Sequence, residues 1–162
     1  MSALCTNAQI RDTFFGFNLG VATKAQVLSG LKSQGEICKY DSENKSYYVE
    51  NVTFASTEWD FCVLEFYKDT LYFVGFALTS ADKGNVDELY KKNLQNTKIK
   101  YDNIKESVVS NEKNYKQSKF DDGNIVMSVC YKQLENMKYN TSVIYQDRKL
   151  ILQIKEDSLN DL

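Results

Sequence analysis

Residues 36–78 contain four short segments that are rich in β-branched and aromatic side chains, a composition typical of β-strands. The turns between them are short and polar, and only Lys68, Asp69 and Thr70 separate the last two segments. Because a parallel connection needs about a dozen residues or more, neighbouring segments joined by such turns pair antiparallel. The sequence therefore predicts an antiparallel β-meander with strands at 36–40, 46–55, 60–67 and 71–78.

Residues 14–20 precede this meander and alternate in polarity. Phe15, Phe17 and Leu19 are apolar, and the residues between them are small or polar. In an extended segment these three side chains share one face. We expect a strand that packs closely on its neighbours and turns at Gly20.

Residues 24–34 have the pattern of an amphipathic helix. Thr23 stands three residues before Gln26, the capping-box spacing in which each side chain satisfies a backbone N–H at the helix start. Gly35 is expected to end the helix, because glycine adopts positive φ without steric cost. Gly30 costs about 1 kcal/mol relative to alanine, so either a neighbour packs closely on it or the cost is tolerated. The stripe expected to face the core consists of Val27, Leu28 and Leu31.

The same order of elements is predicted again after residue 80. A second helix is expected over 85–97, where Asn85 and Glu88 have the capping-box spacing. Residues 101–112 are polar and are interpreted as a connection, with a short extended piece at 106–110 left open.

Two hairpins are predicted after this connection. The first joins 115–120 to 125–132 across a turn that contains Asp-Gly, a pair that adopts the positive φ of tight turns. The second joins 141–146 to 149–155 across Asp147 and Arg148.

The two hairpin turns at Lys68-Asp69 and Asp147-Arg148 lie in similar surroundings. Segments 66–74 (FYKDTLYFV) and 144–154 (IYQDRKLILQI) each have an aromatic residue, an Asp turn and an apolar run. We therefore expect an α+β fold in one domain over 10–162: an antiparallel β-meander sheet with helices on one face. One helix plus four strands would occur twice, at 10–80 and 81–160, and a single extended meander with two helices is the alternative.

The chain contains no histidine and no proline. The missing histidine removes Ser-His and Cys-His pairs, most transition-metal sites and the usual general base near neutral pH. All basic residues except Arg11 and Arg148 are lysine, which argues against a dedicated phosphate or nucleic-acid reader. We expect a non-enzymatic protein with no cofactor, no metal and no nucleic-acid partner. A hydrolase or lyase that uses carboxylates without histidine is the alternative.

Residues 1–9 resemble the end of a secretory signal. Thr6 and Ala8 are small residues in the small-x-Ala pattern of a cleavage site, so we expect export to the periplasm or the exterior, with a mature start near Gln9. A disordered N-terminus is the alternative, and lipid attachment at Cys5 is disfavoured because Leu4 precedes it. No segment approaches the length of an apolar membrane span. Three further cysteines lie in strand-like runs and are expected to be small buried hydrophobes: Cys38, Cys62 and Cys130.

The strand at 60–67 provides the candidate binding site. Alternation sends Cys62, Leu64 and Phe66 towards the core and a second, largely apolar set the other way. Depending on register, the preceding strand adds either Tyr47 with Val49 or Tyr48 with Val52 to that second set, and Trp59 stands at its edge. The candidate partner-binding residues are Tyr47, Trp59, Phe61, Val63 and Tyr67. The alternative is that the second helix, or a symmetric partner chain in a homodimer, covers this face of the strand.

Three carboxylates are candidates for a chemical role. Asp121 and Asp122 are adjacent but lie in a predicted hairpin turn, where Asp forms local hydrogen bonds. Glu65 interrupts an apolar strand and is expected on its solvent face rather than in a catalytic pocket.

Residues 14–35 carry a resemblance to known families. The stretch GVATKAQV at 20–27, followed by Leu31, resembles the opening of the small outer-membrane lipoproteins of the barrel-assembly machinery. The run FFGFNLG at 14–20 is similar to a strand found in small exported proteins of gut Bacteroidetes. The tandem-repeat β-lactamase inhibitor proteins likewise pack helices on an antiparallel sheet. The resemblance implies such a fold and a binding or scaffolding module of the cell envelope, with an envelope protein or another ligand as partner.

Overall fold

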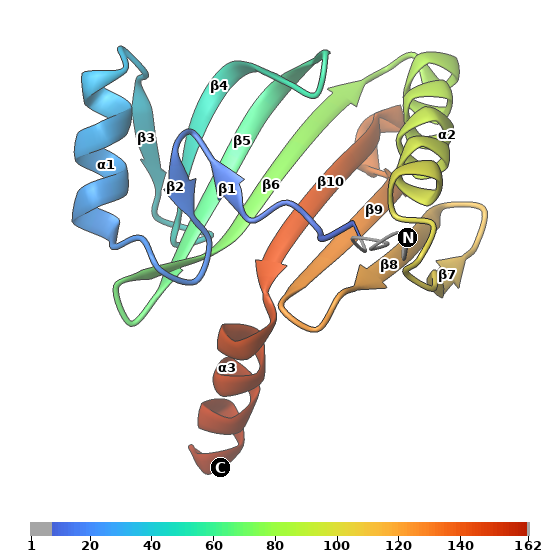
Figure 1. The fold of residues 1–162 in the computed structure, drawn as a ribbon. Helices are drawn as coiled ribbons and strands as arrows, with labels where there is room; N and C mark the ends of the chain where they lie inside the picture. Colours follow the sequence, from blue (N-terminus) through green and yellow to red (C-terminus); the bar gives the residue numbers. More distant parts are fainter. Residues whose placement is uncertain (1–7, 162) are drawn as a thin grey trace, which may run out of the picture.

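The structure is a computed structural model that describes residues 8–161. Within this part of the chain eight strands form one sheet: β3 (Cys38–Asp41), β4 (Ser46–Phe54), β5 (Thr57–Tyr67), β6 (Thr70–Ser80), β7 (Ser107–Asn111), β8 (Tyr115–Asp121), β9 (Ile125–Gln133) and β10 (Tyr139–Asp147). Their order across the sheet is β3-β4-β5-β6-β10-β9-β8-β7, and every neighbouring pair is antiparallel (Figure 1). The predicted α+β class and antiparallel sheet are confirmed.

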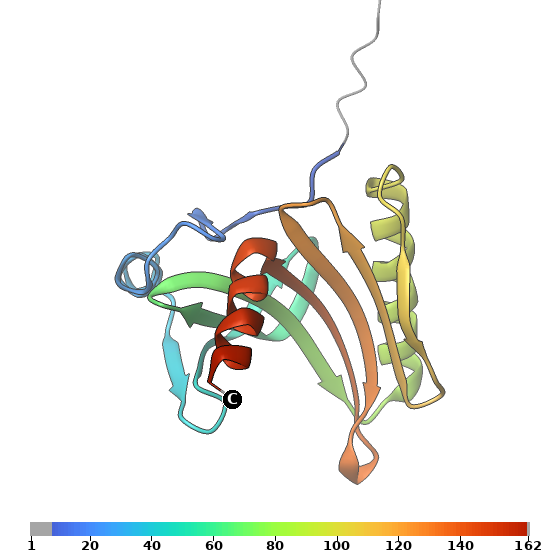
Figure 2. The same cartoon turned by 90° about the horizontal axis from the view of Figure 1, so that it is seen from below.

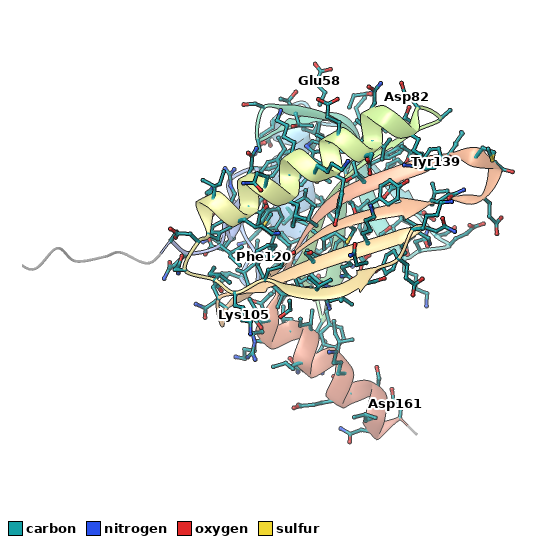
Figure 3. The ribbon with its side chains drawn as sticks, turned by 90° about the vertical axis from the view of Figure 1, so that its right-hand side faces the viewer. Glu58, Asp82, Lys105, Phe120, Tyr139 and Asp161 are labelled. Atoms are coloured by element: carbon teal, nitrogen blue, oxygen red, sulfur yellow. The ribbon has the colours of Figure 1, made fainter. Side chains whose placement is uncertain are left out.

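Two helices, α1 (Lys24–Ser33) and α2 (Lys83–Lys100), cover one face of this sheet. Helix α1 lies against β3 and β6, and α2 lies against β6, β9 and β10. Seen from below, the two helices stand at opposite ends of a strongly curved sheet (Figure 2). Figure 3 shows α2 crossing the strands obliquely from its start near Asp82. Their buried side chains join one hydrophobic core, so we call this side the covered face and the opposite side the open face.

The predicted start and end of α1 are confirmed. The Thr23 hydroxyl accepts a hydrogen bond from the Gln26 backbone N–H (3.3 Å), and the Gln26 side chain accepts one from the Thr23 N–H (3.0 Å). Gly35 has a φ of +81°. Phe17 packs closely on Gly30, where a Cβ atom would lie 2.2 Å from Cζ of Phe17.

The single strand expected at 14–20 is wrong. The segment folds back on itself as a small hairpin of β1 (Thr13–Phe14) and β2 (Phe17–Asn18). Phe15 and Gly16 form its turn, with φ values of 51° and 83°. The turn reverses the chain between the two strands, so Phe14 rather than Phe15 is the buried aromatic residue.

The predicted cap of the second helix is also wrong. Helix α2 begins at Lys83, and the Asp82 carboxylate accepts a hydrogen bond from the Asn85 backbone N–H (3.2 Å). Both Asp82 and Asn85 are good N-cap residues, and the one earlier in the chain performs the role. The extended piece left open at 106–110 is present as β7.

The second predicted hairpin, 141–146 with 149–155, is the largest error. The chain after β10 forms a third helix, α3 (Arg148–Asn160), which projects away from the end of the sheet (Figure 1). Asp147 caps it by accepting a hydrogen bond from the Leu150 backbone N–H (2.8 Å). A short apolar run such as LILQI fits a helix and a strand equally, and Asp serves both turns and helix caps.

Two further expectations concern the ends of the chain and the membrane. The signal-like pattern of residues 1–9 lies outside the described residues except for Ala8 and Gln9, and Cys5 lies outside them too. None of the helices within 8–161 is long and apolar enough to cross a membrane.

Candidate functional site

Strand β5 has one side in the core and one side on the open face. Cys62 and Leu64 are 0% and 1% exposed beneath the helices. Phe61, which is 37% exposed, and the half-buried Val63 lie on the other side. The predicted alternation of these four residues is confirmed.

The register between β4 and β5 decides which residues of β4 share the open face. Tyr48 pairs with Val63 and therefore lies on the open face. Tyr47 pairs with Leu64 and lies on the covered face, where its ring centroid is 4.9 Å from that of Tyr40. The placement of Tyr47 beside the other candidate residues is therefore wrong.

Trp59 was expected at the edge of the open face and instead belongs to the core. It is 2% exposed, its partner Val52 on β4 is buried as well, and its indole N–H donates to the Phe54 carbonyl (3.2 Å). Strict alternation fails because Asn51, opposite Asp60, has a φ of 53°. This left-handed residue interrupts the pleat, so the residues beyond it turn to the covered face.

Tyr67 lies at the far end of β5, beyond a bulge between Glu65 and Phe66. Its hydroxyl donates a hydrogen bond to the Asp157 carboxylate on α3, which also pairs with Lys68 Nζ at 2.7 Å. The hydrogen bond with Asp157 raises the pKa of Tyr67. Tyr67 thus contacts α3 rather than the other candidate residues.

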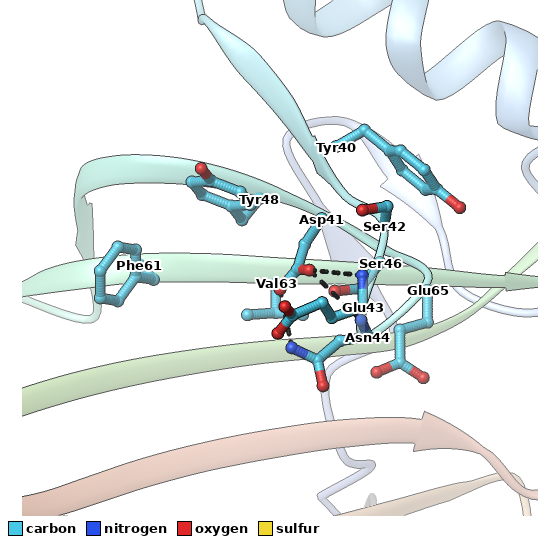
Figure 4. Close-up of a pocket in the computed structure, with 10 residues that line it drawn as sticks. All are labelled: Tyr40, Asp41, Ser42, Glu43, Asn44, Ser46, Tyr48, Phe61, Val63 and Glu65. Carbon is cyan, nitrogen blue, oxygen red and sulfur yellow. Dashed lines mark hydrogen bonds between the residues drawn. The ribbon is translucent and has the colours of Figure 1, made fainter.

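Phe61 and Val63 lie in a hollow of about 640 Å³ on the open face, which we call the open-face hollow (Figure 4). Strands β4 and β5 form its floor, and the β3–β4 turn forms one wall. The residues that define its chemistry are Asp41, Glu43, Tyr48, Phe61 and Glu65. Figure 4 shows the rings of Tyr48 and Phe61 side by side at one end of the hollow and Glu65 at the other.

The lining of this hollow carries three carboxylates and no basic side chain. Asp41 accepts hydrogen bonds from the Asn44 side-chain amide (2.7 Å) and from the backbone N–H groups of Asn44 and Glu43, and these hold its pKa below its usual value. The Lys39 ammonium, opposite Tyr48 in the ladder, forms an ion pair with Glu50 (2.9 Å). The hollow is therefore acidic as well as aromatic.

Glu65 has a neighbour that orients it. The Tyr72 hydroxyl donates a hydrogen bond to its carboxylate. Burial, and then this hydrogen bond, raise the pKa of Tyr72, so the phenol stays protonated and continues to donate. Glu65 presents a fixed negative charge at the edge of the hollow.

The other candidate groups form local hydrogen bonds or are buried in the structure. Asp121 and Asp122 accept hydrogen bonds from backbone N–H groups of their own turn, as predicted. Cys62 and Cys130 are buried and Cys38 is half-buried; all three are free thiols whose pKa is raised by burial. Across residues 8–161 no group of three or more acidic or cysteine side chains could hold a metal ion.

Sequence reasoning missed the wall of the hollow, namely Asp41 and Glu43, and its candidate list named Tyr47 where the register places Tyr48. The register of β4 on β5 was the missing information, because it determines which aromatic residue of β4 stands beside Phe61. No family model, curated protein or solved structure matches the chain.

Proposed function

We propose that this protein is a non-enzymatic binding module that takes its ligand in the open-face hollow. The observation that carries the proposal is the combination, in a space of about 640 Å³, of exposed aromatic rings and carboxylates with no basic side chain. This volume lies within the range of about 300–1,000 Å³ typical of ligand pockets.

The ligand that fits this chemistry carries a positive charge. The rings of Tyr48 and Phe61 meet edge to face with centroids 6.1 Å apart, and a ring face attracts a cation. Glu43 is exposed, and Glu65 is held in place by Tyr72, so both carboxylates can pair with an incoming ammonium or guanidinium. We infer that the ligand is a lysine- or arginine-bearing segment of a partner protein.

The proposed setting is the bacterial cell envelope, with an exported, periplasmic or extracellular protein. The resemblance of residues 14–35 to envelope proteins and the small-x-Ala pattern ending at Ala8 support it.

We also propose that the fold arose from a tandem repeat over 10–80 and 81–160. Helix α1 precedes β3 to β6, α2 precedes β7 to β10, and the last strands of the two sets pair with each other, which supports this origin. Helix α3 has no counterpart in the first half and would be an addition to the second.

The binding proposal is tested with hexalysine and hexaglutamate as probes. In amide NMR spectra of isotope-labelled protein, hexalysine is expected to shift the signals of the β3–β4 turn and of residues around Phe61, whereas hexaglutamate is not. Equal responses to both peptides, or shifts confined to another surface, would contradict the proposal.

Variants of the open-face hollow test whether hexalysine binds there. Glu65→Gln combined with Phe61→Ser removes one charge and one ring of the hollow and is expected to weaken hexalysine binding about tenfold. The matched control is Val108→Ser with Glu112→Gln, which makes equivalent changes on exposed residues at and just beyond the distant edge strand β7. Equal losses in both variants would mean that the peptide binds through net charge alone.

A further inference from the structure

A second, smaller pocket lies on the covered face, beneath the C-terminal half of α2. Its volume is about 120 Å³, and its walls come from α2, the β4–β5 turn, strands β9 and β10 and the segment around Arg11. We call it the α2 pocket. It shares no lining residue with the open-face hollow and lies on the other side of the sheet.

The interior of the α2 pocket is apolar and closely packed. Trp59, Met127 and Tyr145 line it and are 5% exposed or less. Phe54, another wall, stacks on Phe76 with centroids 4.0 Å apart and planes 3° from parallel, which fixes its ring. Apolar cavities of about 150 Å³ accept a molecule of the size of benzene, so the α2 pocket suits a single ring or a branched hydrocarbon group.

One polar group in the pocket wall lacks a partner. The side-chain amide nitrogen of Asn93 is buried and forms no hydrogen bond with any described residue. The nearby Thr97 hydroxyl donates to the Asn93 backbone carbonyl (2.7 Å) and forms no hydrogen bond with the Asn93 side-chain amide. A buried donor without an acceptor destabilises the protein, so an acceptor on a ligand would be bound favourably here.

The pocket lining is positively charged. Arg11, Lys92 and Lys100 line it, no acidic side chain does, and none of the three forms an ion pair within the part of the chain that the structure describes. The guanidinium carbon of Arg11 lies 5.1 Å from the centroid of the Phe54 ring, and Lys100 Nζ lies 5.3 Å from that of Tyr101. The charges of the lining therefore favour an anion.

We propose that the α2 pocket binds a small organic acid, with an aromatic ring or branched hydrocarbon group against Phe54 and Trp59 and a carboxylate towards Arg11 and the Asn93 amide. The hydrocarbon part fills the apolar interior, and the carboxylate meets the cations of the lining that form no ion pair with any described residue. This ligand is opposite in charge to the one proposed for the open-face hollow, so the two sites are independent and are tested with different probes.

Trp59 makes the proposal directly measurable. It is the one tryptophan of the chain and a wall of the pocket, so intrinsic fluorescence reports on ligand entry. The probes are benzoate, benzyl alcohol and benzylamine, which share a ring and differ in charge. We expect a saturable change in fluorescence with benzoate, with a dissociation constant of about 1 mM or lower, and at least about tenfold weaker binding of the other two. Equal binding of benzoate and benzyl alcohol, or no saturable change with benzoate, would overturn the proposal.

Two charge variants complete the test. Arg11→Gln changes an exposed side chain at the pocket and is expected to weaken benzoate binding about tenfold while leaving benzyl alcohol unaffected. Lys149→Gln makes the same change in net charge on α3, outside the pocket lining, and is expected to bind benzoate like the parent protein. An equal loss in Lys149→Gln would show that net charge rather than the pocket governs binding and would overturn the proposal. Thermal unfolding of both variants confirms that they are folded.

Discussion

The covered and open faces of the sheet are built from alternate residues of the same strands, yet they have different surroundings. On β5, Leu64 lies in the core beneath two helices, while its neighbour Val63 lines an open hollow. Both faces are rich in aromatic rings, so aromatic content alone does not decide which side of a strand becomes the core. The helices decide it, because they remove one face from water and leave the other accessible.

The two faces also differ in the charge around their pockets. Carboxylates line the open-face hollow, whereas cations line the α2 pocket. A net charge of −2 over the whole chain conceals this separation. The charge of the residues that line a pocket is therefore a better guide to its ligand than the net charge of the chain.

The largest expected effect comes from the core side of β5. Leu64→Ala should lower the free energy of unfolding by about 3 kcal/mol, because it leaves a cavity beneath the helices. Val63→Ala, on the open face, should cost about 1 kcal/mol or less. Urea unfolding of both variants measures the difference between the faces, and equal costs would mean that the open face is packed as tightly as the core.

A smaller loss is expected from Phe61→Ser combined with Tyr67→Ser. The double variant should remain folded and monodisperse, with a smaller loss of stability than Leu64→Ala that includes the hydrogen bond between Tyr67 and Asp157. Tyr67→Phe separates the hydrogen bond from the ring. Failure of the double variant to fold would place the open-face residues in a core, such as that of a homodimer.

Helix α1, which covers part of the sheet, can be destabilised by removing its N-terminal cap. Thr23→Ala should cost about 1 kcal/mol, because the Gln26 backbone N–H loses its side-chain partner. Ser29→Ala, at an exposed position of the same helix, serves as the control. A urea midpoint for Thr23→Ala that equals the control would contradict the assigned role of the cap.

The smallest effect concerns an ion pair within α2 and depends on pH. Asp87 accepts a hydrogen bond from Lys91 Nζ (2.8 Å), which holds the pKa of Asp87 below its usual value. The pair therefore stabilises the fold above the unfolded pKa of about 3.9, and this contribution is lost as the pH falls through the lower folded pKa.

Asp87→Asn tests this sign. At neutral pH the variant should be less stable by a few tenths of a kcal/mol, because Lys91 is largely solvent-exposed and the pair is screened by water. In denaturation experiments the difference should vanish by about pH 2, where Asp87 is protonated in both states. Glu88→Gln is the matched control, and a difference that persists at low pH would assign the effect to packing instead of charge.

Local features of the fold could be predicted from the sequence. The Thr23–Gln26 capping box and the hairpin around Asp122-Gly123 depend on residues close together in the chain, and both are present. Positions that depend on distant partners or on one unusual dihedral angle could not. Trp59 changed faces because of the left-handed conformation of Asn51 on a neighbouring strand.

The same distinction explains the candidate site. Alternation within β5 identified Phe61 and Val63, because it needs no partner. Tyr48 and the β3–β4 turn wall became visible only with the register of β4 and the folded shape of that turn. Helix α3 was missed because a mainly apolar run of five residues has no period that separates a helix from a strand.

The pairing of β6 with β10 has a consequence for how the chain folds. Every other pair in the eight-stranded sheet joins strands that are consecutive in sequence, whereas this one encloses α2 and three strands. Contacts between distant residues form late, since closing a long loop costs more entropy than closing a short one. Two local meanders can therefore form first, and the rate-limiting step would join them. Until that step, β6 is an unpaired edge carrying Val74 and Phe76, so a high protein concentration during refolding favours exchange of the second meander between two chains.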